Sequence, residues 1–287
     1  MRAQKHHFQP TCLSMPQNTR RSKLGQNFLV NLQACEAIAA ASGDLSQRAV
    51  VEIGPGRGAI TEILAARAQQ LIAIELDTLL AAQLRQRFAA QTHVKIMEAD
   101  VLDVDFGELQ TDKAKLEVIG NLPYYITSDI LLHLFRYSAV IHRAVIMVQR
   151  EVAERVLATP GTSEYGVLSA TAQMFAQVEK LMTLPPDAFS PPPEVHSTVI
   201  RLTMAPRFEE LKVDAEGFFA FLRAGFAQKR KMLAKNLRIA GLEAQTIATA
   251  FEKGCVSSTA RAEELTLEQS AALYREIKGQ NSIALIR

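Results

Sequence analysis

The chain has 287 residues, of which 48% are hydrophobic and 22% charged, a composition that excludes intrinsic disorder and allows one large or two ordinary domains. The formal net charge of +2 is too small to indicate a nucleic-acid partner by itself. No apolar run reaches the roughly 18 residues of a membrane span, and three widely spaced cysteines without a CxxC pair indicate neither zinc nor disulfides, so we expect a metal-free cytoplasmic protein.

The N-terminal segment comes first. Residues 1–20 mix Gln, Pro, His, Asn and Thr without periodicity and predict a flexible arm. The Ala-rich apolar spacing of residues 31–41 then predicts a helix.

Short apolar segments alternate with helical patterns in the next hundred residues. Strands are expected at residues 49–53, 71–74, 94–97, 116–119 and 144–148, and helices at 60–68, 79–88 and 130–135. Such alternation predicts an α/β protein with a Rossmann-like parallel sheet that is covered on both faces. Ligands bind such sheets at the carboxyl ends of the strands, where the glycines of 54–58, Glu75, Asp100 and Asn121 stand. We therefore expect these residues to meet in one crevice.

The C-terminal part changes pattern. A last strand is expected at 198–202, and helices at 218–227, 231–240, 244–253 and 267–277. The change places a domain boundary near Pro206, which divides the chain into an arm (1–20), a catalytic domain (21–205) and a small all-helical domain (206–287). No acid lies between Glu216 and Glu243.

That acid-free stretch carries a group of cations, namely Lys229, Arg230, Lys231, Lys235 and Arg238. Clustered cations of this kind are typical of a phosphate-binding surface, and we expect these five to bind RNA. The alternative is an ordinary solvated helix face.

The first glycine loop, residues 52–58 (EIGPGRG), links a strand to a helix and leaves two cofactors open. Gly54 and Gly56 would let the backbone approach a ligand, and Glu75 would bind ribose hydroxyls. The same pattern fits the dinucleotide fingerprint of a nicotinamide-dependent dehydrogenase. Glu52 and Asp100 favour S-adenosylmethionine, because a carboxylate suits its ammonium and sulfonium and another can accept a hydrogen bond from its adenine amine.

Residues 121–124 (NLPY) follow the fourth strand and resemble the hallmark of methyltransferases that modify exocyclic amines of bases. The nitrogen of such an amine is a poor nucleophile, and it needs an acceptor for each N–H more than it needs a strong base. The side-chain oxygen of Asn121 and the main-chain carbonyl of Leu122 can supply these acceptors, most strongly as positive charge develops on nitrogen. Tyr124 offers a face for the extruded base, and Phe189 a second ring, unless it is simply a core residue.

Taken together, the motifs resemble the KsgA/RsmA-type ribosomal RNA adenine N6,N6-dimethyltransferases over nearly the whole chain except residues 1–20. The matching segments are 24–29 (LGQNFL), 51–56 (VEIGPG), 74–77 (IELD), 120–125 (GNLPYY), 147–153 (MVQREVA), 189–193 (FSPPP) and 226–233 (FAQKRKML). The resemblance implies a class I methyltransferase sheet with S-adenosylmethionine bound by Asn27, Leu29, Gly54, Glu75, Asp100 and Asn121.

The resemblance also implies the substrate. Such enzymes dimethylate two adjacent adenosines in a 3′-terminal hairpin loop of small-subunit (16S) ribosomal RNA, within an assembling 30S particle during ribosome biogenesis. We expect a monomer. Related erythromycin-resistance methyltransferases carry similar motifs and modify large-subunit RNA, and a catalytically silent assembly factor is a further alternative. A dehydrogenase would leave residues 121–124 and the basic stretch without a role.

Overall fold

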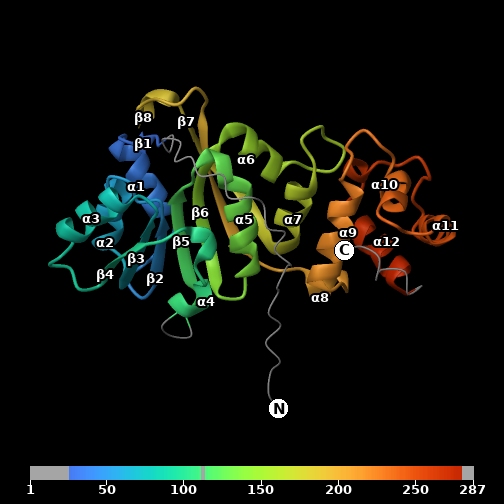
Figure 1. Cartoon of the computed structure of the whole chain (residues 1–287), viewed down its shortest axis with the longest axis horizontal. Coiled ribbons are helices and arrows are strands. Elements are labelled where there is room, and N and C mark those ends of the chain that lie inside the picture. Colours follow the sequence, from blue (N-terminus) through green and yellow to red (C-terminus); the bar gives the residue numbers. More distant parts are fainter. Residues whose placement is uncertain (1–25, 111–113, 280–287) are drawn as a thin grey trace, which may run out of the picture.

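The structure, a computed structural model, describes residues 26–110 and 114–279. The predicted arm, residues 1–20, lies outside the described residues, as do Leu24 and Gly25 of the first matching segment. Figure 1 shows a sheet flanked by helices on one side of the molecule and a group of helices on the other.

A seven-stranded sheet forms the centre of the larger part, with the strand order β4-β3-β2-β5-β6-β9-β7. Its strands are β2 (Ala49–Ile53), β3 (Gln70–Glu75), β4 (Val94–Glu98), β5 (Leu116–Asn121), β6 (Ile141–Gln149), β7 (Ala176–Leu184) and β9 (Ser197–Met204). The expected strands are all present. The sheet is not wholly parallel, because β9 runs antiparallel to both of its neighbours, and β7 was not expected from the sequence.

A separate two-stranded sheet joins segments that are far apart in the chain. β1 (Phe28–Leu29) pairs antiparallel with β8 (Phe189–Ser190). The pairing carries the N-terminal segment across the carboxyl ends of the central strands, where the functional residues are expected.

The helices of the larger part are α1 (Leu32–Ala41), α2 (Ala59–Ala65), α3 (Thr78–Arg87), α4 (Phe106–Leu109), α5 (Thr127–Arg136), α6 (Arg150–Leu157) and α7 (Val167–Phe175). Those of the C-terminal part are α8 (Phe208–Leu211), α9 (Ala215–Gly225), α10 (Leu233–Ile239), α11 (Ala244–Lys253) and α12 (Leu267–Gly279). Short 3-10 turns are η1 (Val101–Asp103), η2 (Tyr124–Ile126), η3 (Pro186–Ala188) and η4 (Ala262–Glu264).

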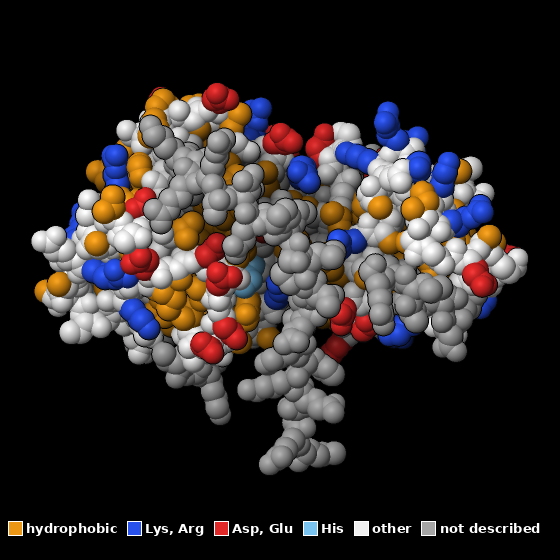
Figure 2. All heavy atoms as spheres, in the orientation of Figure 1, with side chains coloured by type: hydrophobic (Ala, Val, Ile, Leu, Met, Phe, Trp, Pro, Cys, Tyr) orange, Lys and Arg blue, Asp and Glu red, His pale blue; other side chains and the backbone are white. Residues whose placement is uncertain are grey.

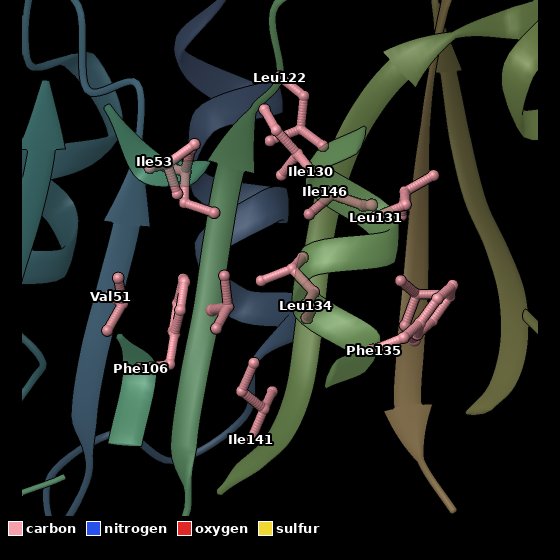
Figure 3. Packing of buried hydrophobic residues seen from close by; sticks show 14 of the residues in the cluster. Val51, Ile53, Phe106, Leu122, Ile130, Leu131, Leu134, Phe135, Ile141 and Ile146 are labelled. Carbon is pink, nitrogen blue, oxygen red and sulfur yellow. The ribbon is translucent and has the colours of Figure 1, made fainter. Parts of the chain in front are cut away.

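Alternate residues of each central strand enter different cores, as a sheet covered on both faces requires. Val51 and Ile53 pack in one buried cluster with α5, whereas Val50 packs in another with α1 and α2. Figure 3 shows the first cluster, in which side chains of α5 lie against β5 and β6. Burial on both sides explains the near-continuous apolar sequence of these strands.

The C-terminal helices have a core of their own, but it extends beyond the expected boundary near Pro206. Tyr165, Ala170 and Met174, which precede that boundary, belong to the same buried cluster as residues of α9 to α12. Phe175, at the end of α7, packs against both this cluster and the core of the sheet. We therefore treat the boundary as a proposal, with α7 shared between the two parts.

Candidate active site

A cleft opens at the carboxyl ends of β2, β3 and β5, where the topology predicts a ligand site. It encloses about 860 Å³, part of which is open to solvent, within the range that suits a small ligand. Most of the predicted site residues line it: Asn27, Gly54, Gly56, Glu75, Asp100, Asn121, Leu122 and Tyr124.

The glycine loop forms the floor of this cleft. Gly54 and Gly56 have φ angles of +66° and +58°, in the left-handed region that favours glycine. A Cβ atom on Gly56 would lie 2.9 Å from Cδ1 of Phe28, and one on Gly54 would lie 3.3 Å from the carbonyl oxygen of Asn121. The loop therefore packs so closely under its neighbours that a larger residue would displace them.

Glu75 closes the end of β3 and is almost fully buried. Its Oε2 accepts a hydrogen bond from the amide of Gly56 (3.0 Å), and its Oε1 accepts one from the amide of Asp77 (2.9 Å). Each carboxylate oxygen has a further lone pair, so this fixed carboxylate can accept hydrogen bonds from a pair of ribose hydroxyls.

Asp100 stands at the end of β4, on the same side of the cleft. Its Oδ1 accepts a hydrogen bond from the amide of Leu102 (2.9 Å) and caps η1, while the described residues donate no hydrogen bond to its Oδ2. Leu76, Val101 and Ile130 line the cleft nearby and provide an apolar surface for a flat ring. A carboxylate oxygen beside an apolar slot fits the adenine of S-adenosylmethionine, whose amine can donate to it.

The side chain of Asn121 is held in one orientation by the N-terminal segment. Its Nδ2 donates to the main-chain carbonyl of Asn27, at 3.1 Å. Because the amide nitrogen is engaged there, Oδ1 remains to accept a hydrogen bond inside the cleft. The amide of Leu122 is likewise engaged with the carbonyl of Met147 (3.0 Å), and no backbone N–H of the described residues donates to its own carbonyl.

Tyr124 is half-buried, and its hydroxyl group lies 2.8 Å from Oγ of Ser197 on β9. The turn that carries it is braced by Thr127, whose hydroxyl donates to the carbonyl of Pro123 (2.9 Å). The ring is therefore anchored at both ends and can present a fixed surface to a base.

Glu52 is buried beneath the loop and does not line the cleft, contrary to the role beside the ligand that the sequence suggested. Burial raises its pKa to about 8, and the negative charge of Glu75 adds to the increase. Its Oε2 has no hydrogen-bond partner among the described residues. Burial therefore favours the protonated form of the Glu52 carboxyl at neutral pH.

Two further predicted residues lie outside the cleft. Leu29 and Phe189 face each other in the β1–β8 pair, and both belong to the buried cluster under α1. Phe189 is only 3% exposed, so in this conformation its ring is not available for stacking on a base. An aromatic residue before a proline run also suits a short strand that closes a core, and this is where the structure places Phe189.

The lining also contains residues that the sequence did not single out. Gln26 and Phe28 come from the N-terminal segment, and Tyr125 and Ile126 from η2. The sequence nevertheless carried a signal for them, because Gln26, Phe28 and Tyr125 belong to two of the matching segments, 24–29 and 120–125, and Ile126 directly follows the second. Phe28 in addition carries the guanidinium of Arg57 over its ring, with Cζ 4.4 Å from the centroid.

The predicted RNA-binding cations lie on the C-terminal part, around α10. Lys229, Arg230, Lys235 and Arg238 are exposed, and Lys231 is half-buried. Lys229 to Lys231 stand in the turn between α9 and α10. A helix was expected from residue 231, but α10 begins at Leu233, so Lys231 lies outside it. Figure 2 shows Lys and Arg side chains gathered over the helices on this side of the molecule.

Neither a metal site nor a membrane span emerges from the described part of the chain. Within residues 26–110 and 114–279, no three His, Cys, Asp or Glu side chains are grouped so as to hold a metal ion. Across the same residues, every helix is too short or too polar to cross a membrane.

The comparison with known proteins agrees with the geometry of the cleft. The profile of the family described as ribosomal RNA adenine dimethylase matches residues 17–279. The chain belongs to this family. It is therefore an S-adenosylmethionine-dependent methyltransferase that acts on adenine of ribosomal RNA.

Curated relatives cover nearly all of the chain. A protein of Acidobacterium capsulatum named ribosomal RNA small subunit methyltransferase A is 59% identical, over 91% of this chain and 92% of its own length. A protein of the same name from Koribacter versatilis is 51% identical, over 90% of this chain and 95% of its own.

Solved structures share the fold of this dimethylase. A dimethyladenosine transferase from Plasmodium falciparum has a TM-score of 0.74 at 22% identity, covering 89% of this chain and 98% of its own. The 23S ribosomal RNA methyltransferase ErmE has a TM-score of 0.65 at 23% identity, covering 88% of this chain and 100% of its own. At such identities the likeness shows the class I methyltransferase fold and does not distinguish small-subunit from large-subunit substrates.

Proposed function

We propose that this dimethylase modifies two adjacent adenosines in the 3′-terminal hairpin loop of small-subunit ribosomal RNA, within an assembling 30S particle, and that it acts as a monomer. The orientation of Asn121 carries the proposal, because its amide nitrogen is engaged with Asn27 and its oxygen is left to accept. The 59% identity to a small-subunit methyltransferase supports this substrate over large-subunit RNA.

When bound, S-adenosylmethionine supplies an electrophilic methyl group. We assign its ribose to Glu75, its adenine to Asp100 and its close backbone contacts to Gly54 and Gly56, which all line one cleft. We also keep Asn27 among the cofactor contacts. Leu29 acts at most through its backbone, since its side chain is buried in the core.

The chemistry of the target amine follows from two acceptors. In the first transfer, Oδ1 of Asn121 accepts one N–H of adenine N6 and the carbonyl oxygen of Leu122 accepts the other. In the second transfer the methylated nitrogen keeps one N–H, which one of these two oxygens accepts. Both bonds strengthen as the nitrogen becomes positive during methylation, so they lower the barrier more than they strengthen ground-state binding. Tyr124 holds the extruded base by stacking on its anchored ring.

The basic residues around α10 supply sequence-independent affinity for the RNA backbone. Four of the five cations are exposed, and they are Lys229, Arg230, Lys235 and Arg238. Contacts between such cations and phosphates release counterions, so the affinity for RNA should fall with salt.

The deciding experiment uses undermethylated small-subunit particles from a strain that lacks this chain. With labelled S-adenosylmethionine, the wild-type protein should transfer methyl groups to two adjacent adenosines, which nuclease mapping would identify. Transfer to large-subunit RNA instead would contradict the substrate, and absence of transfer to either would contradict the activity. In a thermal melt, S-adenosylhomocysteine should raise the Tm and NAD should not, which separates the proposal from a dehydrogenase.

A further inference from the structure

The mouth of the cleft carries an aromatic ring that the proposed chemistry leaves unused. Tyr125 lines the cleft, yet 62% of its surface is exposed. The other large hydrophobic residues with comparable exposure in the described part of the chain are aliphatic: Val30, Leu32, Leu76, Leu79, Val195, Met232 and Ile239. Tyr125 is thus the exposed tyrosine of the described surface, and it stands at the rim of the cleft.

The backbone presents this ring rigidly. Tyr125 is the middle residue of η2, a 3-10 turn that continues directly into α5. Thr127 braces the turn through its hydrogen bond to the carbonyl of Pro123 (2.9 Å). A ring on a fixed backbone loses little conformational freedom when a flat partner binds, so it is a suitable stacking surface.

Two neighbouring tyrosines are used differently in this turn. A 3-10 turn has about three residues per turn, so successive side chains point roughly 120° apart. Tyr124 points toward β9, where its hydroxyl meets Ser197. At Tyr125, burial raises the pKa of the hydroxyl, and the charge of the nearby Asp100 carboxylate adds to this increase. The ring of Tyr124 is held by Ser197, whereas the ring of Tyr125 lies at the edge of the cleft with most of its surface exposed.

A base drawn into the cleft leaves its neighbour in the RNA strand without a stacking partner on one side. We propose that Tyr125 supplies that partner and stacks against the nucleobase adjacent to the adenine being methylated. The ring thereby holds the strand in register with Asn121 while the target is in the cleft. This inference rests on the proposed function, since it requires a single-stranded RNA substrate at the same site.

Kinetics with undermethylated small-subunit particles test the role of the ring. Tyr125→Phe keeps the ring and should behave as wild type, whereas Tyr125→Leu keeps an apolar side chain without a π-face. Stacking predicts that Tyr125→Leu raises the KM for particles roughly 5- to 150-fold, with unchanged binding of S-adenosylhomocysteine. A Leu variant with wild-type KM overturns the inference, as does one that loses S-adenosylhomocysteine binding equally, because the ring would then cover the cofactor.

A fluorescence experiment observes the stack directly. The chain contains no tryptophan, so Tyr125→Trp introduces a single indole at the cleft. Leu79→Trp is the matched control, because Leu79 is 74% exposed on α3 and does not line the cleft. A short oligoadenylate RNA should quench the indole at position 125 and leave the control unchanged. Equal quenching in both variants, or none in either, overturns the inference.

The two levels of the proposal fail in different ways. If wild-type protein transfers no methyl group to the particles, the proposed function fails and the stacking role falls with it. If wild-type protein is active but the Leu and Trp variants show neither effect, only the role of Tyr125 is overturned.

Discussion

The side-chain amide of Asn121 donates a hydrogen bond to the main-chain carbonyl of Asn27, with 3.1 Å between Nδ2 and O. The two residues are 94 positions apart, and the contact decides which end of the amide faces the cleft. A residue that only accepts hydrogen bonds cannot make it, because a carboxylate oxygen would face the carbonyl oxygen of Asn27 and be repelled.

Two substitutions of Asn121 test this orientation. Asn121→Asp keeps acceptor oxygens but loses the donor to Asn27, and Asn121→Ala loses both. We expect Asn121→Asp and Asn121→Ala each to lower kcat by roughly 100-fold or more, the usual cost of losing one preorganised polar contact to a transition state. Calorimetric titration should show S-adenosylhomocysteine still binding both variants. Wild-type turnover in Asn121→Asp would show that the contact with Asn27 does not orient the side chain.

The close packing around Gly56 predicts that its substitution has a different effect from substitution of a glycine in open space. Gly56→Ala and Gly161→Ala both place a Cβ atom on a left-handed backbone, at a cost of about 1–2 kcal/mol. Only the first meets an obstacle, Cδ1 of Phe28 at 2.9 Å, whereas nothing lies within 4 Å of the second. Both variants should melt earlier, but only Gly56→Ala should lose the rise in Tm that S-adenosylhomocysteine gives. Equal rises in both would contradict the close packing described here.

Buried Glu52 gives the protein a pH dependence with a definite sign. Its pKa is about 8 in the folded protein and 4.5 as the ordinary value, so folding keeps a proton that the unfolded chain gives up. Its contribution to stability is fully present below pH 4.5 and is lost as the pH rises toward 8, by about 1.4 kcal/mol per pH unit. Glu52→Gln mimics the neutral acid and should gain Tm over wild type as the pH increases.

Melting curves from pH 5 to 8 check this, and Glu252→Gln serves as control because Glu252 is exposed on α11. The difference in Tm from wild type should widen with pH only for Glu52→Gln. A constant difference across the range would mean that Glu52 is already ionised in the folded protein.

The basic residues around α10 predict a change in salt dependence. Reversing Lys229, Arg230, Lys235 and Arg238 to Glu should weaken binding to small-subunit RNA. Each lost phosphate contact should lower the slope of log K against log salt by about 0.7–0.9. Lys95→Glu, on the edge strand β4, changes an exposed cation at the far end of the sheet and should leave the slope unchanged. An unaltered slope in the fourfold variant would remove this surface from the RNA interface.

The sequence predicted the central strands well because each is buried on two faces and therefore reads as an apolar run. A strand was expected at residues 49–53, and β2 has the same bounds. β7 was missed because its sequence, AQVEKLMTL, mixes exposed charged residues with apolar ones at the edge of the sheet. The reversed direction of β9 could not be predicted, since periodicity carries no information about strand direction.

The residues of the candidate site also differ in how well the sequence predicted them. Glycines and acids at strand ends were predictable because the topology brings strand ends together. The burial of Phe189 was not predictable, because an aromatic side chain fits a core and a stacking platform equally well. Only the pairing of β8 with β1 places this residue inside. The contact of Asn121 with Asn27 also needs the folded chain, as nothing local joins them.

Three aromatic rings connect the sheet to the C-terminal helices. Phe175 stacks on Phe135 of α5, with centroids 5.4 Å apart and planes 8° from parallel, and meets Phe208 of α8 edge-on at 5.1 Å. A hinge between the two parts would have to separate these rings, so their contacts oppose movement of the cations near α10 relative to the cleft. Under the proposed function, an RNA whose loop and phosphates already lie at the distance between the cleft and α10 would bind at both places without a rearrangement of the enzyme.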